Sequence, residues 1–158
     1  MNERYRSRPL QLAEELRRKY NLTYPPVNAG LVIVDYPIRV TLEDWNADIS
    51  GVFVRGHTIN HIGLNKNHSL ERRHFTLWHE FYHFHEHKTV NLCEFKNRNT
   101  ANLLEREADV FAAHFLMPED WVRDQFKKLH GNIRAMAQQF LVSMAAMQNR
   151  LIALRLIA

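Results

Sequence analysis

The sequence predicts an α+β fold in which an N-terminal helix and a small antiparallel sheet precede a mainly helical second half. Three observations support this prediction. An amphipathic repeat near the start is typical of a helix, and short runs rich in Val and Ile between Gly, Pro and Asn are typical of strands. From Ser69 onward, helix-forming residues dominate. Because 46% of the 158 residues are hydrophobic and 24% are charged, the chain is expected to fold around one core.

The first predicted element is an amphipathic helix over residues 9–20. Leu12, Leu16 and Tyr20 recur at every fourth position with charged residues between them, and Pro9 suits a first helical turn. Three strands are expected after this helix. They are predicted at Leu31 to Val34, Gly51 to Arg55 and Thr58 to Leu64, with Arg55-Gly56 as a hairpin turn.

Five helices are predicted in the second half, over residues 69–87, 101–117, 118–129, 132–140 and 143–156. Ser69 and Ser143 can cap helix starts, Pro118 suits a first turn, and Gly131 can close a helix. A single domain is therefore expected over residues 1–158. Residues 1–68 would hold the first helix and the sheet, residues 69–130 the central helices, and residues 131–158 a helical tail.

The composition excludes several classes of protein. No apolar run approaches the roughly 20 residues needed to cross a bilayer, and the N-terminus lacks the apolar core of a secretion signal. A cytoplasmic protein without a membrane partner is therefore expected. Cys93 is the single cysteine, which excludes an internal disulfide and a finger-type zinc site held by thiolates. The net charge of +4 does not by itself indicate a nucleic-acid-binding protein.

The central motif is His79-Glu80-Phe81-Tyr82-His83, an H-E-x-x-H on the helix predicted from Ser69. Histidines four residues apart on a helix project from the same face, so both imidazoles can bind one zinc ion while Glu80 activates the attacking water. Aromatic residues surround this helix, which is therefore expected to be buried. Burying such polar groups is costly unless they are paired or bind a metal. The alternative is a set of hydrogen-bonded core histidines.

A catalytic zinc needs a third protein ligand, and the nearby histidines do not supply it. His87 lies about 12 Å along the helix axis from His79, too far to share a metal held between His79 and His83. His85 points to the side of Trp78 and Phe81.

The better donor lies on the helix predicted over residues 101–117. Glu105 and Asp109 lie together at the edge of its apolar arc, whereas Glu107 and His114 fall on the far side. Glu105 is therefore predicted to be the third ligand. Asp109, one turn further on, is placed to hold the free ring nitrogen of a ligand histidine.

With these residues, the chain resembles the ImmA/IrrE family of metallopeptidases, whose active site is gluzincin-like. The resemblance covers residues 72–118. It rests on Arg73-His74-Phe75-Thr76-Leu77-Trp78-His79-Glu80-Phe81-Tyr82-His83, similar to R-x-F-T-x-x-H-E-x-x-H, on Glu105-Arg106-Glu107-Ala108-Asp109-Val110-Phe111-Ala112, similar to E-x-x-A-N/D-x-F-A, and on Phe115-Leu116-Met117-Pro118. His87 matches a further family histidine. Tyr82 departs from the family, which usually has a small residue before the second histidine.

The resemblance implies a zinc-dependent endopeptidase with Zn²⁺ bound by His79, His83 and Glu105 and with Glu80 as the catalytic residue. It also implies a regulatory role. Several relatives are anti-repressors that cleave helix-turn-helix transcriptional repressors encoded beside them in mobile genetic elements or stress regulons. A helix-turn-helix repressor is therefore the expected protein substrate. The sequence predicts no particular oligomeric state.

Two alternatives belong to other functional classes. Residues 131–158 look like a helix-turn-helix with Val142-Ser143 at the turn, which would suit a DNA-binding transcriptional regulator. The second helix offers few polar groups for that role, namely Gln148, Asn149, Arg150 and Arg155. The other alternative is a metal-binding regulator that does not cleave. Glu80 argues against it, because a structural zinc has four protein ligands and needs no such glutamate.

Two expectations concern substrate binding. An extended substrate is expected along residues 59–64, taken as the edge strand of the predicted sheet. Tyr82, His57, His61 and Tyr36 are candidates for stabilising the oxyanion.

Overall fold

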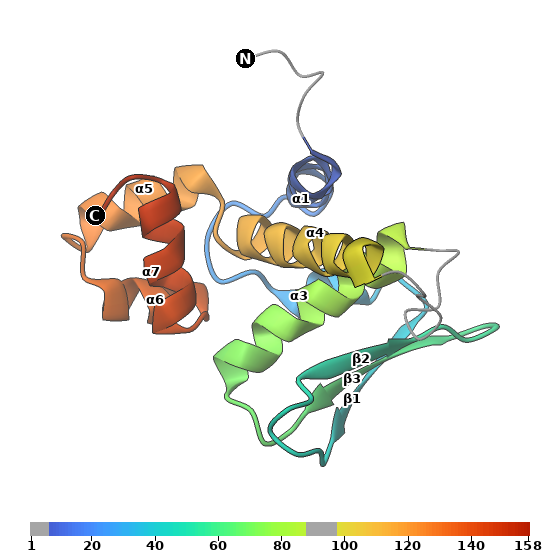
Figure 1. The fold of residues 1–158 in the computed structure, drawn as a ribbon. Helices are drawn as coiled ribbons and strands as arrows, with labels where there is room; N and C mark the ends of the chain where they lie inside the picture. Colours follow the sequence, from blue (N-terminus) through green and yellow to red (C-terminus); the bar gives the residue numbers. More distant parts are fainter. Residues whose placement is uncertain (1–6, 88–97) are drawn as a thin grey trace.

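Seven helices and three strands make up the part of the chain that the structure describes, residues 7–87 and 98–158 of a computed structural model (Figure 1). In chain order they are α1 (Arg8–Lys19), α2 (Ala29–Ile33), β1 (Ile38–Glu43), β2 (Gly51–Val54), β3 (Asn60–Asn65), α3 (Leu70–Glu86), α4 (Arg98–Leu116), α5 (Glu119–Lys128), α6 (Ile133–Phe140) and α7 (Met144–Ala153). The predicted α+β class is confirmed. Cys93 lies outside the described residues.

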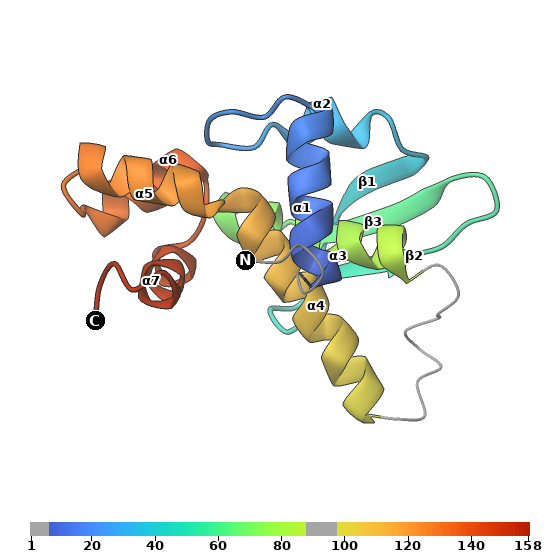
Figure 2. The same cartoon turned by 90° about the horizontal axis from the view of Figure 1, so that it is seen from above.

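Helix α1 forms as the amphipathic pattern predicts. Pro9 lies in its first turn, and Leu12, Ala13 and Leu16 are buried on one face. That face packs against α4, so the two helices lie side by side (Figures 1 and 2).

The sheet is mixed, so the prediction of an antiparallel sheet is wrong for one of its two strand pairs. The strand order is β1-β3-β2. β2 and β3 are antiparallel, with Phe53 opposite Ile62, whereas β1 is parallel to β3, with Val40 opposite Ile62. β3 is therefore the central strand and cannot be the substrate-binding edge expected from the sequence. The edges are β1 and β2.

Residues 31–34, predicted as a strand, belong instead to the short helix α2 and its C-terminal end. The side chain of Asn28 accepts a hydrogen bond from the backbone N–H of Gly30 and caps the helix start. The first strand is β1, which was not among the predicted ones.

Helices α3 and α4 carry the centre of the core. Ser69 caps α3 by accepting a hydrogen bond from the backbone N–H of Arg72. The rings of Trp78 and Phe115 meet at 4.6 Å between centroids, and those of Phe81 and Phe111 at 6.2 Å. These buried rings fix how the two helices lie against each other. The inner face of α3 also packs on β2 and β3.

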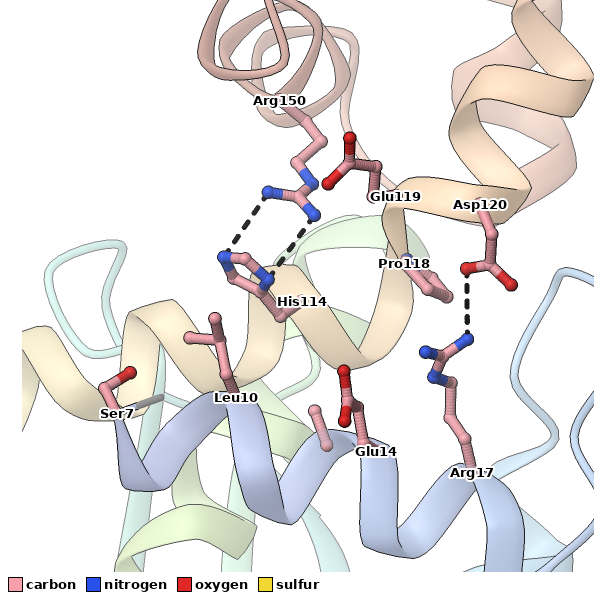
Figure 3. A pocket seen from close by; sticks show the side chains of 10 residues that line it. Ser7, Leu10, Glu14, Arg17, His114, Pro118, Glu119, Asp120 and Arg150 are labelled. Atoms are coloured by element: carbon pink, nitrogen blue, oxygen red, sulfur yellow. Dashed lines mark hydrogen bonds and ion pairs between the residues drawn. The ribbon is translucent and has the colours of Figure 1, made fainter. Parts of the chain in front are cut away.

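Helices α5, α6 and α7 form a group on the other side of α3 and α4 from the sheet (Figures 1 and 2). Arg150 of α7 is buried and its Nε–H donates to the carbonyl oxygen of Met117, while the guanidinium lies over the ring of His114 (Figure 3). An ion pair between Arg17 and Asp120 links α1 to α5 across the same cavity, whose volume is about 660 Å³. The helical tail is therefore joined to the rest of the chain by specific polar contacts.

Among the described residues, no helix combines the length and the apolar character that spanning a membrane requires.

Candidate metal centre

Helix α3 carries His79, Glu80 and His83 close together, and this helix packs against the edge strand β2. His79 and His83 are one turn apart, and their Nε2 atoms are 3.1 Å apart. The side chain of His83 is 1% exposed and that of His79 is 14% exposed. Glu80 is buried as well. The H-E-x-x-H residues are thus held inside the protein, as the aromatic surface of this helix predicts.

Helix α4 brings two carboxylates to these histidines. Glu105 lies with one carboxylate oxygen 3.0 Å from Nε2 of His79 and the other 3.0 Å from Nε2 of His83. Asp109 accepts a hydrogen bond of 2.8 Å from Nδ1–H of His79. The structure therefore brings together all five residues that the sequence singles out.

The donor atoms of His79, His83 and Glu105 fit a divalent metal ion. These donor atoms all lie within 4.8 Å of one another. Among the described residues, the three side chains therefore form a group that could hold a metal ion. A tetrahedral zinc with ligands at about 2.1 Å would hold its donor atoms about 3.4 Å apart, close to the contacts of 3.0 and 3.1 Å found here. Two imidazoles and one carboxylate are also a donor set typical of catalytic zinc.

The remaining ring nitrogens of both histidines are engaged, which leaves each Nε2 directed toward the shared point. Asp109 holds Nδ1 of His79. Nδ1 of the buried His83 lies 2.8 Å from Nδ1 of His87, which caps the C-terminus of α3. Such partners fix the tautomer and orientation of a metal-binding imidazole. The spacing of four residues between His83 and His87 is the sequence signal for this second contact.

Glu107, predicted on the far side of this helix from Glu105, is half-buried. It accepts a hydrogen bond of 3.3 Å from the hydroxyl of Tyr82, and it lies 3.6 Å from Nε2 of His87. Glu107 therefore places a carboxylate near His87, at a longer distance than the 2.8 Å between Asp109 and His79.

The electrostatics of the centre favour a bound cation. Burial by itself lowers the pKa of His79, but hydrogen bonds to Asp109 and Glu105 outweigh it and raise the pKa to about 10. Hydrogen bonds from His79 and His83 hold the pKa of Glu105 far below its usual value. The carboxylates thus stabilise positive charge at this point, whether it is carried by a proton or by a metal.

Glu80 faces a cleft of about 540 Å³ beside the two histidines. The cleft is lined by Asp48, Ile49, Ser50, Gly51, Arg72, Phe75, Thr76, His79, Glu80, Glu105 and Asp109. Burial raises the pKa of Glu80, and the neighbouring His79 and His83 act in the opposite direction. A carboxylate whose affinity for protons is raised by burial is suited to accept a proton from water.

The suggested oxyanion residues are not gathered at this cleft. Tyr36 packs edge-on against Phe81 at 5.0 Å, and the hydroxyl of Tyr82 is engaged with Glu107. His57 is exposed between β2 and β3, and His61 lies on β3. Arg72, which donates to Ser50 across the cleft, is a polar residue at the site that sequence reasoning missed.

Comparisons with known proteins identify the family of this chain. The family model Peptidase M78, the IrrE N-terminal-like domain, matches residues 35–152. Ten chains of solved structures are significantly similar, among them a Mycobacterium tuberculosis transcriptional regulator with a TM-score of 0.70 and 14% sequence identity. The similarity covers 90% of this chain and 46% of that chain, so this chain spans less than half the length of the regulator. At this identity the likeness shows a shared fold. No curated protein sequence matches significantly.

Proposed function

Because the chain belongs to the ImmA/IrrE family of metallopeptidases, we propose that it is a zinc-dependent endopeptidase. The proposed zinc ligands are His79, His83 and Glu105, and Glu80 is the proposed catalytic base. The observation that carries this proposal is the convergence of the three donor groups beside the buried Glu80. Such a set leaves room for water and substrate, whereas a structural zinc is closed by four protein ligands.

In this mechanism the zinc ion, when bound, supplies the Lewis acidity that polarises the attacking water and the scissile carbonyl group. Glu80 accepts the proton of the water and then delivers it to the nitrogen of the departing amine, so that its carboxylate is restored. Asp109 and His87 keep the two ligand imidazoles in the required tautomer. Gly51 allows β2 to lie close to α3, because a Cβ atom there would overlap the side chain of Thr76 and lie 3.3 Å from Cγ of Glu80.

An extended substrate would bind along β2, the sheet edge next to the centre. Ser50 accepts a hydrogen bond from the backbone N–H of Asn65, so in this antiparallel ladder the next residue, Gly51, directs its N–H and C=O groups away from β3. Phe53 is oriented in the same way, but its backbone N–H donates a hydrogen bond to the carboxylate of Glu80. A peptide aligned with this edge would therefore meet the outward-facing backbone groups of Gly51 next to Glu80. This replaces the central strand β3 as the proposed substrate-binding strand.

A helix-turn-helix transcriptional repressor is the proposed substrate. The support comes from the family, whose members include anti-repressors, and it is compatible with the shared fold of a protein described as a transcriptional regulator. A protease of this kind would be site-specific, so its activity would be absent with generic substrates.

Direct DNA binding through α6 and α7 has less support. Arg150, one of the four polar residues counted for that role, is 7% exposed and is held by Met117. Gln148 and Asn149 are exposed on α7, and Arg155 follows it. These side chains are few for both phosphate and base contacts.

The test combines zinc content with cleavage of a helix-turn-helix repressor encoded beside this chain. Glu80→Gln is expected to keep one zinc per chain and to lower the cleavage rate about 10²–10⁴-fold, because it removes the base but no ligand. His79→Ala and Glu105→Gln are expected to lose the zinc. Asp124→Asn, an acid-to-amide change on the exposed side of α5, is the matched control. Unchanged cleavage by Glu80→Gln would remove Glu80 from the mechanism, and a wild-type chain that binds no zinc would end the enzyme proposal.

A further inference from the structure

Within residues 7–87 and 98–158, the edge strand β1 has backbone groups that no neighbouring strand uses. The carbonyl groups of Pro37 and Glu43 accept hydrogen bonds from backbone N–H groups at the two ends of β3. In a parallel pair, alternate residues turn both their N–H and C=O groups toward the partner strand. Arg39 and Thr41 therefore turn these groups toward β3, as Pro37 and Glu43 turn their carbonyl groups. Val40 and Leu42, which alternate with them, direct their N–H and C=O groups away from β3 and toward the free edge.

The same two residues carry exposed apolar side chains. Val40 pairs with Ile62 and Leu42 pairs with Leu64 across the sheet. Ile62 and Leu64 are buried, because α3 packs on β2 and β3, yet Val40 is 37% exposed and Leu42 is 56% exposed. Figure 1 shows β1 on the side of the sheet away from α4. Within the described residues, the inner side of β1 therefore keeps an apolar surface that the helices leave uncovered.

The sequence of β1 is complementary to itself when a second copy runs antiparallel. With Thr41 opposite Thr41 of the second copy, Val40 lies opposite Leu42. Because both of these residues point their backbone groups outward, each of the two Val40–Leu42 pairs can form two hydrogen bonds. In the same register, Arg39 lies opposite Glu43 at both ends. These side chains project from the other face of the strand, on both sides of the central threonines.

We propose that two copies of this chain associate through β1 into a dimer with a continuous six-stranded sheet and a two-fold axis at Thr41. The partner is a second copy because the charges match in the self-paired register, Arg39 with Glu43 twice. The pairing would cover Val40 and Leu42 of both copies and would remove a free sheet edge. The metal centre lies beside β2, the opposite edge of the sheet, so both centres would stay open. The dimer does not depend on the proposed function.

A contact made by a single short strand is small, so the dimer is expected to form and dissociate with concentration. Sedimentation equilibrium of the full chain over a wide concentration range measures it directly. The mass is expected to rise from 18.8 kDa toward twice that value as the concentration increases.

Charge exchange at the two ends of the strand tests the register. Arg39→Glu places two glutamates opposite each other at both ends, and Glu43→Arg does the same with two arginines. Each single change is expected to raise the dissociation constant about tenfold, and the double change should restore it. Arg134→Glu, at an exposed position of α6, is the matched control that should leave association unchanged. Circular dichroism confirms that each variant is folded.

Three results would overturn the proposal. The first is a wild-type mass of one chain at every concentration. The second is association of both single variants as strong as that of the wild type. The third is a double variant as weak as the single ones, which would mean that Arg39 and Glu43 do not face each other.

Discussion

Replacing Asp109 by Asn isolates what the contact to His79 contributes to zinc affinity. Asn keeps the size and one acceptor oxygen of Asp, but it loses the negative charge that attracts Nδ1–H of His79 over 2.8 Å. Carboxylate partners of metal-binding histidines contribute about 10–100-fold to metal affinity. The side chain of Asp109 is 61% exposed, so solvent screens its charge and the lower end of this range is expected. The dissociation constant for zinc should therefore rise about tenfold, or about 1.4 kcal/mol.

Competition against a chromogenic zinc chelator measures this affinity. Asp109→Ala should weaken binding further, because it also removes the acceptor, and Asp124→Asn should bind zinc like the wild type. Unchanged zinc affinity in both Asp109 variants would mean that the hydrogen bond to His79 does not contribute to metal binding.

Three further predictions test the surroundings of the centre. Gly51→Ala should destabilise the fold by about 1–3 kcal/mol in chemical denaturation, since its methyl group would overlap the side chain of Thr76; an unchanged midpoint would contradict this packing. His87→Ala should raise the dissociation constant for zinc by about 10–100-fold, because it releases the buried ring of His83. Wild-type affinity in chelator competition would show that His87 does not orient His83. Burial, followed by a neighbouring guanidinium, lowers the pKa of His114 from 6.5 to about 4. The unfolded chain therefore takes up this proton first as the pH falls. A pKa difference of this size corresponds to roughly 3.4 kcal/mol for a fully buried group, but His114 is only partly buried, so stability should drop by on the order of 2 kcal/mol between those values. His114→Gln should flatten this part of the stability curve measured by denaturation, and an unaltered curve would argue against it.

The helices could be predicted because their patterns are local. The positions of α1 and α3 follow from apolar periodicity together with Pro9 and Ser69, which act within one turn of the residues they affect. The centre was predictable for the same reason. His79 and His83 share a helix face by spacing alone, and Glu105 with Asp109 lies at the edge of a clear apolar arc.

The sheet could not be predicted in full, because strand pairing depends on contacts between distant residues. Nothing local in residues 38–43 shows that they pair in parallel with β3 while β2 occupies its other side. Residues 31–34 have an apolar composition that suits a strand or a buried helical turn equally well, and the cap from Asn28 decides between them. The contacts of Glu107 with Tyr82 and His87 could not be predicted, because helical position alone does not show which residues of another helix lie nearby.

All the side chains that meet at the centre come from α3 and α4, whereas the opposite wall of the cleft comes from β2 and the residues just before it. A mutation would therefore change different properties of the proposed enzyme in these two regions. Substitutions at Asp48 to Ser50 can alter which peptide is admitted without moving a donor atom, while the aromatic contacts between Trp78 and Phe115 constrain the two helices. The two tasks of the proposed enzyme, holding a metal and admitting a substrate, therefore fall on separate parts of the fold.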